Sequence, residues 1–213
     1  MPKALSPMKK PDNAMQWLPL ASLKPTQITV GMQYVALKVL DTRRREGAAR
    51  RALLERHPLP CVRAPDGSVY VVDHHHWARA WFECGIDTVP VRFALEVKAH
   101  SMPSFWRKME RRNWLHPFDA HGRRRDVSEL PGSIAMMRDD PYQSLAALAR
   151  QCGAYRKSRE RYSSFVWADF LREHVRLPGN DKVSLLAALV MCAKVARSRK
   201  ARRLPGYAGA MRA

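Results

Sequence analysis

Apolar residues follow two different periods along the chain. Between residues 16 and 93, short β-branched and aromatic runs alternate with segments whose apolar positions recur at helical spacing. After Pro141, apolar residues recur at helical spacing only, and Pro178-Gly179-Asn180 separates the last two segments. The pattern predicts an α+β protein in which a small mixed sheet with helices precedes a helical C-terminal region.

Residues 59–93 form the stretch around which the rest is organised. Pro60–Ala64 and Val69–Val72 predict two strands, and the Asp-Gly pair in residues 65–68 is typical of a hairpin turn. An amphipathic helix should follow and end at Gly85, before a third strand at Thr88–Phe93. The predicted apolar face of this helix comprises Trp77, Ala80, Trp81 and Cys84.

The flanking segments complete the expected organisation. A short strand at Gln16–Leu23 and helical segments around residues 32–40 and 48–54 precede the central stretch. Helices are expected downstream at Pro103–Asn113, Gln143–Gly153, Ser163–Val175 and Val183–Arg199. We divide the chain into a flexible N-terminus (1–15), an α/β domain (16–97), a helical region (98–196) and a loose basic tail (197–213).

Basic residues dominate the charge of the protein. There are 38 Lys+Arg against 19 Asp+Glu, which gives a net charge of +19 and a pI near 10.5. A polyanionic partner such as DNA or a nucleotide would suit this charge. The alternative is a solvated basic surface, to which the Arg runs at 43–45 and 50–51 would then belong.

Cysteine spacing and hydropathy predict the cellular compartment of the protein. Cys61, Cys84, Cys152 and Cys192 show neither CxxC nor zinc-site spacing, so we expect reduced thiols. Residues 1–17 contain no apolar segment of signal-peptide length. The longest apolar run, 183–196, is shorter than the roughly 20 residues that span a bilayer. We expect a cytoplasmic protein with no membrane partner.

The candidate chemistry lies in Asp73-His74-His75-His76, where a predicted strand passes into a helix. Asp73 occupies the expected N-cap position, and free amides at a helix start favour a bound phosphate. His75 and Arg79 are four residues apart and should share a helix face, which would place a proton-transfer group beside a cation. Three alternatives stand beside this interpretation: a simple N-cap, ordinary surface polarity, and a metal site formed by Asp73 with two histidines.

Several segments resemble the ParB/sulfiredoxin-like superfamily, and a ParB-like family described as nucleases within it. They are PLPCVRAPDGSVYVVDHHHWARAWFECGIDTVPVRF, LKPTQITVG, DDPYQSLAALARQCGAYRK and FVWADFLREH, and together they cover roughly residues 16–177. His74 stands where the family signature has Gly, and Trp77 where an Arg often follows. The absence of a junction cysteine argues against sulfiredoxin activity.

The resemblance implies a ParB/Srx-like fold with the site at the strand-to-helix junction. By position it implies Asp73, His75 and His76 as catalytic candidates, and Gln27, Arg79 and Arg112 as phosphate- or nucleotide-binding candidates. In relatives the signature binds and hydrolyses a nucleotide or serves phosphoryl transfer. A divalent ion (Mg²⁺ or Mn²⁺), with Asp73 as a ligand, and a nucleoside triphosphate are the cofactors this chemistry would use.

The leading hypothesis is therefore a nuclease-like or nucleotide-dependent phosphoryl-transfer enzyme. In it His75 or His76 acts as the base or acid, while Arg79 and Arg112 neutralise phosphate charge. The first alternative is a non-catalytic module that binds DNA or a nucleotide. The second is a kinase of a small molecule such as a free amino acid.

Overall fold

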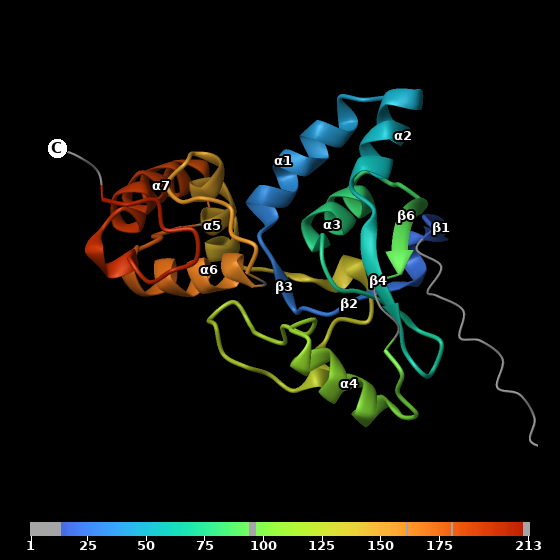
Figure 1. Ribbon diagram of the computed structural model, residues 1–213. Helices are drawn as coiled ribbons and strands as arrows, with labels where there is room; N and C mark the ends of the chain where they lie inside the picture. Colours follow the sequence, from blue (N-terminus) through green and yellow to red (C-terminus); the bar gives the residue numbers. More distant parts are fainter. Residues whose placement is uncertain (1–13, 94–96, 161, 180, 211–213) are drawn as a thin grey trace, which may run out of the picture.

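A curled five-stranded mixed sheet forms the centre of the first half of the protein (Figure 1). The computed structural model describes residues 14–93, 97–160, 162–179 and 181–210. The spatial order is β1-β6-β4-β5-β2, with β4 parallel to β6 and β5 parallel to β2, while the β1–β6 and β4–β5 pairs are antiparallel. The strands are β1 (Gln16–Pro19), β2 (Leu23–Pro25), β4 (Leu59–Arg63), β5 (Val69–Val71) and β6 (Thr88–Phe93).

The central hairpin and the strand after it confirm the apolar pattern. Gly67 has φ 83° in the turn, and the Asp66 side chain accepts a hydrogen bond from the Ser68 amide at 2.9 Å. All three residues of β5 are buried, as expected of a strand covered on both faces. The strand expected at Gln16–Leu23 is instead interrupted by a 3₁₀ turn, Leu20–Ser22, which lets the chain pass from one edge of the sheet to the other.

Three helices cover one face of this sheet. They are α1 (Met32–Arg43), α2 (Gly47–Arg56) and α3 (His75–Glu83), and α1 packs beside α3 (Figure 1). Trp77, Ala80 and Trp81 are buried as the helical spacing predicts, and Gly85, at φ 68°, follows the end of α3.

Helix α4 (Met102–Arg111) packs against the other face of the sheet. Its Phe105 and Met109 are fully buried in one cluster with Val62 and Tyr70 of the hairpin. Helix α4 follows residue 97 in the chain but shares a hydrophobic core with the sheet. The boundary predicted after residue 97 therefore does not separate two independently packed parts.

The remaining helices form a second core. They are α5 (Pro141–Gln151), α6 (Ser163–His174) and α7 (Lys182–Ala196), and they pack around Trp167 and Leu145. A two-stranded parallel pair, β3 (Thr29–Val30) with β7 (Arg138–Asp139), connects them to the first half. Further 3₁₀ turns lie at Val127–Glu129, Ile134–Met136 and Arg199–Ala201.

The described part of the basic tail, up to residue 210, is packed rather than loose. Ala201 is buried, and Leu204 and Tyr207 contact the second core. The Trp167 indole donates to the Pro205 carbonyl at 2.7 Å, which holds the tail on α6. Among the helices described, none is long and apolar enough to cross a bilayer.

Candidate functional site

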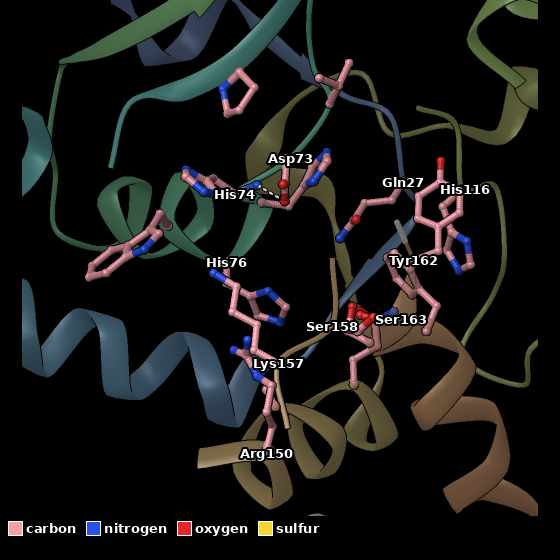
Figure 2. A pocket seen from close by; sticks show the side chains of 18 of the residues that line it. Gln27, Asp73, His74, His76, His116, Arg150, Lys157, Ser158, Tyr162 and Ser163 are labelled. Carbon is pink, nitrogen blue, oxygen red and sulfur yellow. Dashed lines mark hydrogen bonds between the residues drawn. The ribbon is translucent and has the colours of Figure 1, made fainter. Parts of the chain in front are cut away.

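A cavity of about 1000 Å³ lies where the sheet meets α1, α3, α5 and the start of α6. Figure 2 shows side chains from distant parts of the chain arranged around it. The strand-to-helix junction contributes residues 72–77, and the loop before β3 contributes Thr26 and Gln27. The loop between α5 and α6 and the first residues of α6 contribute described residues between 157 and 165.

The β5–α3 junction differs from the expected helix start. The N-cap residue is His74 and not Asp73, and it makes no side-chain cap. Asp73 accepts a hydrogen bond from the His74 amide at 2.6 Å, one residue too early to cap the helix. His74 has φ 64° and ψ 26°, the left-handed conformation that favours glycine. This conformation is available to the Gly of the family signature at the same position.

The His74 imidazole is held in one tautomer. Its Nδ1 lies 3.0 Å from the Pro58 carbonyl oxygen, and because a carbonyl only accepts, Nδ1 must carry the proton. Within the described residues Nε2 has no hydrogen-bond partner, so in the neutral ring its lone pair is open to the cavity. A neutral imidazole held in this way has the form required of a general base.

His75 is used differently. It is 5% exposed, its Nε2 accepts the Thr26 amide at 3.3 Å, and its ring also hydrogen-bonds to the Val71 carbonyl. Burial lowers the pKa of His75 to about 4, against an opposing effect of Asp73. Both ring nitrogens are thus engaged with the backbone, and the residue fixes the loop before β3 against β5.

His76 hydrogen-bonds to the backbone through one of its ring nitrogens. Its Nε2 accepts the Gly31 amide at 3.4 Å, and its ring packs edge-on against Tyr34. Burial lowers its pKa to about 3, with smaller contributions from His75 and Lys38. The neutral ring therefore carries its proton on Nδ1, which is left as a hydrogen-bond donor at the cavity wall.

His116 adds a further imidazole to the cavity wall. Its amide donates to the Thr26 carbonyl at 2.9 Å, and its ring stacks on Phe165 with centroids 3.5 Å apart. Burial lowers its pKa to about 3. The sequence analysis did not single out His116, because one histidine in a loop belongs to no local motif.

Four cationic side chains line the cavity: Lys38, Arg150, Lys157 and Arg159. In the described part of the chain none of them forms a salt bridge, and the carboxylates that share the lining are Asp73 and Glu160. Figure 2 places Arg150 and Lys157 across the cavity from Asp73 and His74. No local motif marks these cations, because they come from α1, α5 and the α5–α6 loop.

The structure brings together only some of the predicted site residues. Asp73, His75, His76 and Gln27 line the same cavity, whereas Arg79 and Arg112 are not among its lining residues. Arg79 instead pairs with Glu83 and donates to the carbonyls of Ala135 and Met137. Its expected pairing with His75 is therefore wrong.

The other cationic candidate also lies elsewhere. The Arg112 guanidinium packs over the Trp114 ring, 5.3 Å from its centroid. Trp114 lines the cavity and Arg112 does not, so Arg112 contacts a wall residue without reaching the cavity itself. Gln27 is 5% exposed and donates to the Thr29 carbonyl at 2.7 Å, which places its side chain between the loop and the cavity (Figure 2).

The described cavity lining offers few ligands for a divalent ion. Within the described residues no group of three or more His, Cys, Asp or Glu side chains is placed to hold a metal. Mg²⁺ in phosphate-processing sites is often held by one or two carboxylates together with substrate oxygens. Asp73 fits that limited role, and an ion bound there would depend on the substrate for its other ligands.

These features define the class of protein. A strand, turn, strand, helix and strand with a cavity at the strand-to-helix junction constitute the ParB/sulfiredoxin-like fold. Residues 17–173 match a family described as "putative ParB-like nuclease", and because this match covers most of the chain, the protein belongs to that ParB-like family.

A solved structure from a bacterium is similar over almost the whole chain. It is the crystal structure of protein Atu1540 from Agrobacterium tumefaciens, with a TM-score of 0.80 and 34% sequence identity. The alignment covers 93% of this chain and 100% of that chain. No curated protein matches the sequence.

Proposed function

We propose that the protein hydrolyses phosphate esters of nucleotides or nucleic acids, with the cavity as the active site. The observation that carries the proposal is the Nε2 of His74 beside Asp73, across the cavity from Arg150 and Lys157. Within the described residues this Nε2 has no hydrogen-bond partner and neither cation forms a salt bridge. The description of the family as nucleases supports the same reaction class. A volume of about 1000 Å³ is at the upper end of the range for small-molecule sites and accommodates a nucleotide.

In the proposed reaction His74 is the general base. Its Nε2 takes a proton from a water molecule whose oxygen attacks phosphorus, and the bond from phosphorus to the leaving oxygen breaks. The leaving oxygen takes its proton from solvent. Lys38, Arg150 and Lys157 neutralise the charge that develops on the phosphoryl oxygens, and His76 donates a hydrogen bond from Nδ1. His75 positions the loop before β3 and does not transfer protons.

The aromatic part of the cavity wall is suited to a base or sugar. The Lys38 ammonium lies 4.2 Å from the centroid of Trp77, which stacks on His57 at 4.5 Å. His116 and Phe165 form a second stacked pair in the lining. A ligand with one anionic end and one planar end matches this division, and nucleotides have that form.

Activity measurements on single variants test the proposal. We expect labelled DNA or nucleoside triphosphates to be cleaved by the wild type in at least one of three conditions: Mg²⁺, Mn²⁺ or EDTA. His74→Ala should lower the rate by roughly 10²–10⁴-fold, as expected for loss of a general base. Asp73→Asn should lower it in the same direction, while His100→Ala, a change at an exposed histidine outside the cavity, should leave it unchanged.

Two other functions give different results in the same measurements. The net charge of +19 favours binding to DNA. A DNA-binding module without catalysis would show salt-dependent binding, with a log–log slope near 0.9 per phosphate contact, and no cleavage. A small-molecule kinase would release ADP or AMP only when an acceptor such as an amino acid is added. Either result would overturn the hydrolase proposal.

A further inference from the structure

Two segments near the cavity carry exposed basic side chains, which we call the basic rim. In the loop between α5 and α6 they are Arg156, Lys157 and Arg159. In the tail after α7 they are Arg199, Lys200, Arg202 and Arg203. Within the described residues none of these side chains forms a salt bridge. Residues 194–210 contain no Asp or Glu, and residues 150–160 contain only Glu160, so the rim has almost no acidic residue of its own.

Two other basic runs of the chain contain their own acidic partners. Arg45 and Arg51 each pair with a carboxylate four residues away. Every arginine of residues 123–125 also pairs with an Asp or Glu side chain. Those runs are neutralised in part within the protein, as expected of a solvated surface. The basic rim has no such partners among the described residues, and its positive field therefore attracts an anionic ligand.

The two segments of the basic rim are in direct contact and extend to the cavity. The Arg156 amide donates to the Gly206 carbonyl at 2.8 Å, and the Arg197 guanidinium donates to the Gly153 carbonyl at 3.4 Å. A Cβ at Gly206 would clash with the Arg156 carbonyl, so the two backbones meet without a side chain between them. Lys157, next to Arg156, lines the cavity (Figure 2). The tail therefore continues the basic surface that begins at the cavity wall.

We propose that the basic rim binds the phosphate backbone of a single-stranded nucleic acid and leads the strand into the cavity. This inference rests on the proposed function and names its substrate as a strand instead of a free nucleotide. The repeated phosphates of a strand suit cations spread over two segments, whereas one nucleotide needs only the cations of the cavity. A cavity of about 1000 Å³ accommodates a nucleotide unit but not a base-paired duplex, which favours a single strand.

Fluorescence anisotropy with labelled oligothymidine and the full chain tests the binding. Arg202→Gln with Arg203→Gln should weaken the affinity at low salt by roughly tenfold or more, because charged contacts to phosphate are lost. It should also reduce the log–log salt slope by about 0.7 for each lost contact, the value for single strands. The matched control is Arg107→Gln with Arg111→Gln, which removes the same charge from exposed positions of α4 that form no salt bridge in the described part of the chain. The control should change the affinity by less than about twofold, because salt screens distant charges.

Thermal unfolding checks that both double variants are folded. If the tail variant is not, Arg199→Gln with Lys200→Gln makes the same charge change at other exposed positions of the rim. A wild type that does not bind the strand, or equal losses of affinity in the rim and α4 variants, would overturn the proposal. Tighter binding of the matching duplex would overturn the choice of a single strand. Binding to phosphatidylserine vesicles without binding to the strand would identify a membrane surface as the partner and overturn it as well.

Cleavage measurements separate this inference from the proposed function. The Arg202 and Arg203 change should lower the rate on oligothymidine relative to the rate on a nucleoside triphosphate, because only the strand extends to the tail. If the wild type cleaves neither substrate but its strand binding depends on the rim, the hydrolase proposal fails and the rim remains a nucleic-acid surface. If the wild type cleaves only the triphosphate, or if the rim change leaves the ratio of the two rates unaltered, the inference about the rim fails and the hydrolase proposal stands.

Discussion

His74 combines a strained backbone with a chemically competent side chain. A residue other than glycine in the left-handed region costs roughly 1–2 kcal/mol, and such residues cluster at functional sites. Here φ is 64°, and the ring is held by the Pro58 carbonyl at 3.0 Å. The fold therefore retains a backbone shape that glycine adopts freely, while the side chain at this point faces a cavity.

Replacing His74 separates the role of the backbone from that of the ring. We expect the free energy of unfolding of His74→Gly to lie within about 1 kcal/mol of the wild-type value, because relief of the backbone strain offsets the lost hydrogen bond. His74→Ala should be less stable than His74→Gly by about 1 kcal/mol, because it loses the same bond and keeps a Cβ. Urea unfolding at neutral pH measures both. An alanine variant at least as stable as the glycine variant would contradict this account of the strain.

The separate roles of His74, His75 and His76 could be predicted from the sequence only in part. The pattern correctly predicted a strand-to-helix junction at residues 72–75, but it could not distinguish three adjacent histidines. Their roles are set by Pro58, Thr26 and Gly31, which lie 16 to 49 residues away in the chain. The tautomer of a histidine depends on such partners, and local spacing contains no information about them.

Elements with a strong local pattern were predicted well, and elements held by distant contacts were not. The helices α1, α2, α3, α5, α6 and α7 begin and end within a few residues of their predicted bounds. Strands β3 and β7 have two residues each and exist because they pair with each other. No periodicity can appear in so short a segment. The packing of α4 on the sheet is likewise a tertiary property of Phe105 and Met109.

Gly31 shows how closely two elements meet beside the cavity. A Cβ at this position would lie 2.4 Å from the Ser144 amide nitrogen of α5. The Gly31 amide is also the group that donates to His76, and the Tyr34 amide donates to the Ser144 hydroxyl at 3.2 Å. The start of α1 and the start of α5 are therefore in direct backbone contact, which only glycine permits here.

A single methyl group at Gly31 should separate these helices. We expect Gly31→Ala to lower the free energy of unfolding by about 1–3 kcal/mol, the usual cost of overpacking. Gly132→Ala is a matched control, because its nearest neighbour, the Met136 sulfur, would lie 3.9 Å from the new Cβ. The control should be neutral to within about 1 kcal/mol. Equal free energies of unfolding for the two variants in urea would show that α1 and α5 can move apart without loss of stability, and would contradict this prediction.

At the scale of the whole molecule, the cavity is the part that sequence could least predict. Its lining includes Lys38 from α1, His76 from α3, Arg150 from α5 and His116 from a long loop. Each of these is unremarkable in its own segment, and only the packing of two cores brings them together. The fold class followed from periodicity and from resemblance, whereas the position of the cations required the three-dimensional arrangement.

The neutral histidines of this cavity should make the whole protein sensitive to acid. In the folded state the pKa is about 4 for His75 and about 3 for His76 and His116, against 6.5 for an unperturbed histidine. The unfolded chain therefore binds protons first as the pH falls, and stability is lost from about pH 6.5 downward. Above that value these residues add no pH dependence, since they are neutral in both states.

Urea unfolding at about pH 7.5, 6 and 5 measures this loss, in a range above the usual pKa values of carboxylates. Each histidine that stays neutral contributes a slope of up to about 1.4 kcal/mol per pH unit. His116→Phe should reduce the slope by one such contribution, because a phenyl ring can keep the stack on Phe165 without titrating. The matched control is His121→Phe, the same change at an exposed position outside the cavity. A free energy of unfolding that stays constant down to about pH 5 would mean that these rings accept protons in the folded state, and the backbone amides of Thr26 and Gly31 would then have lost their acceptors.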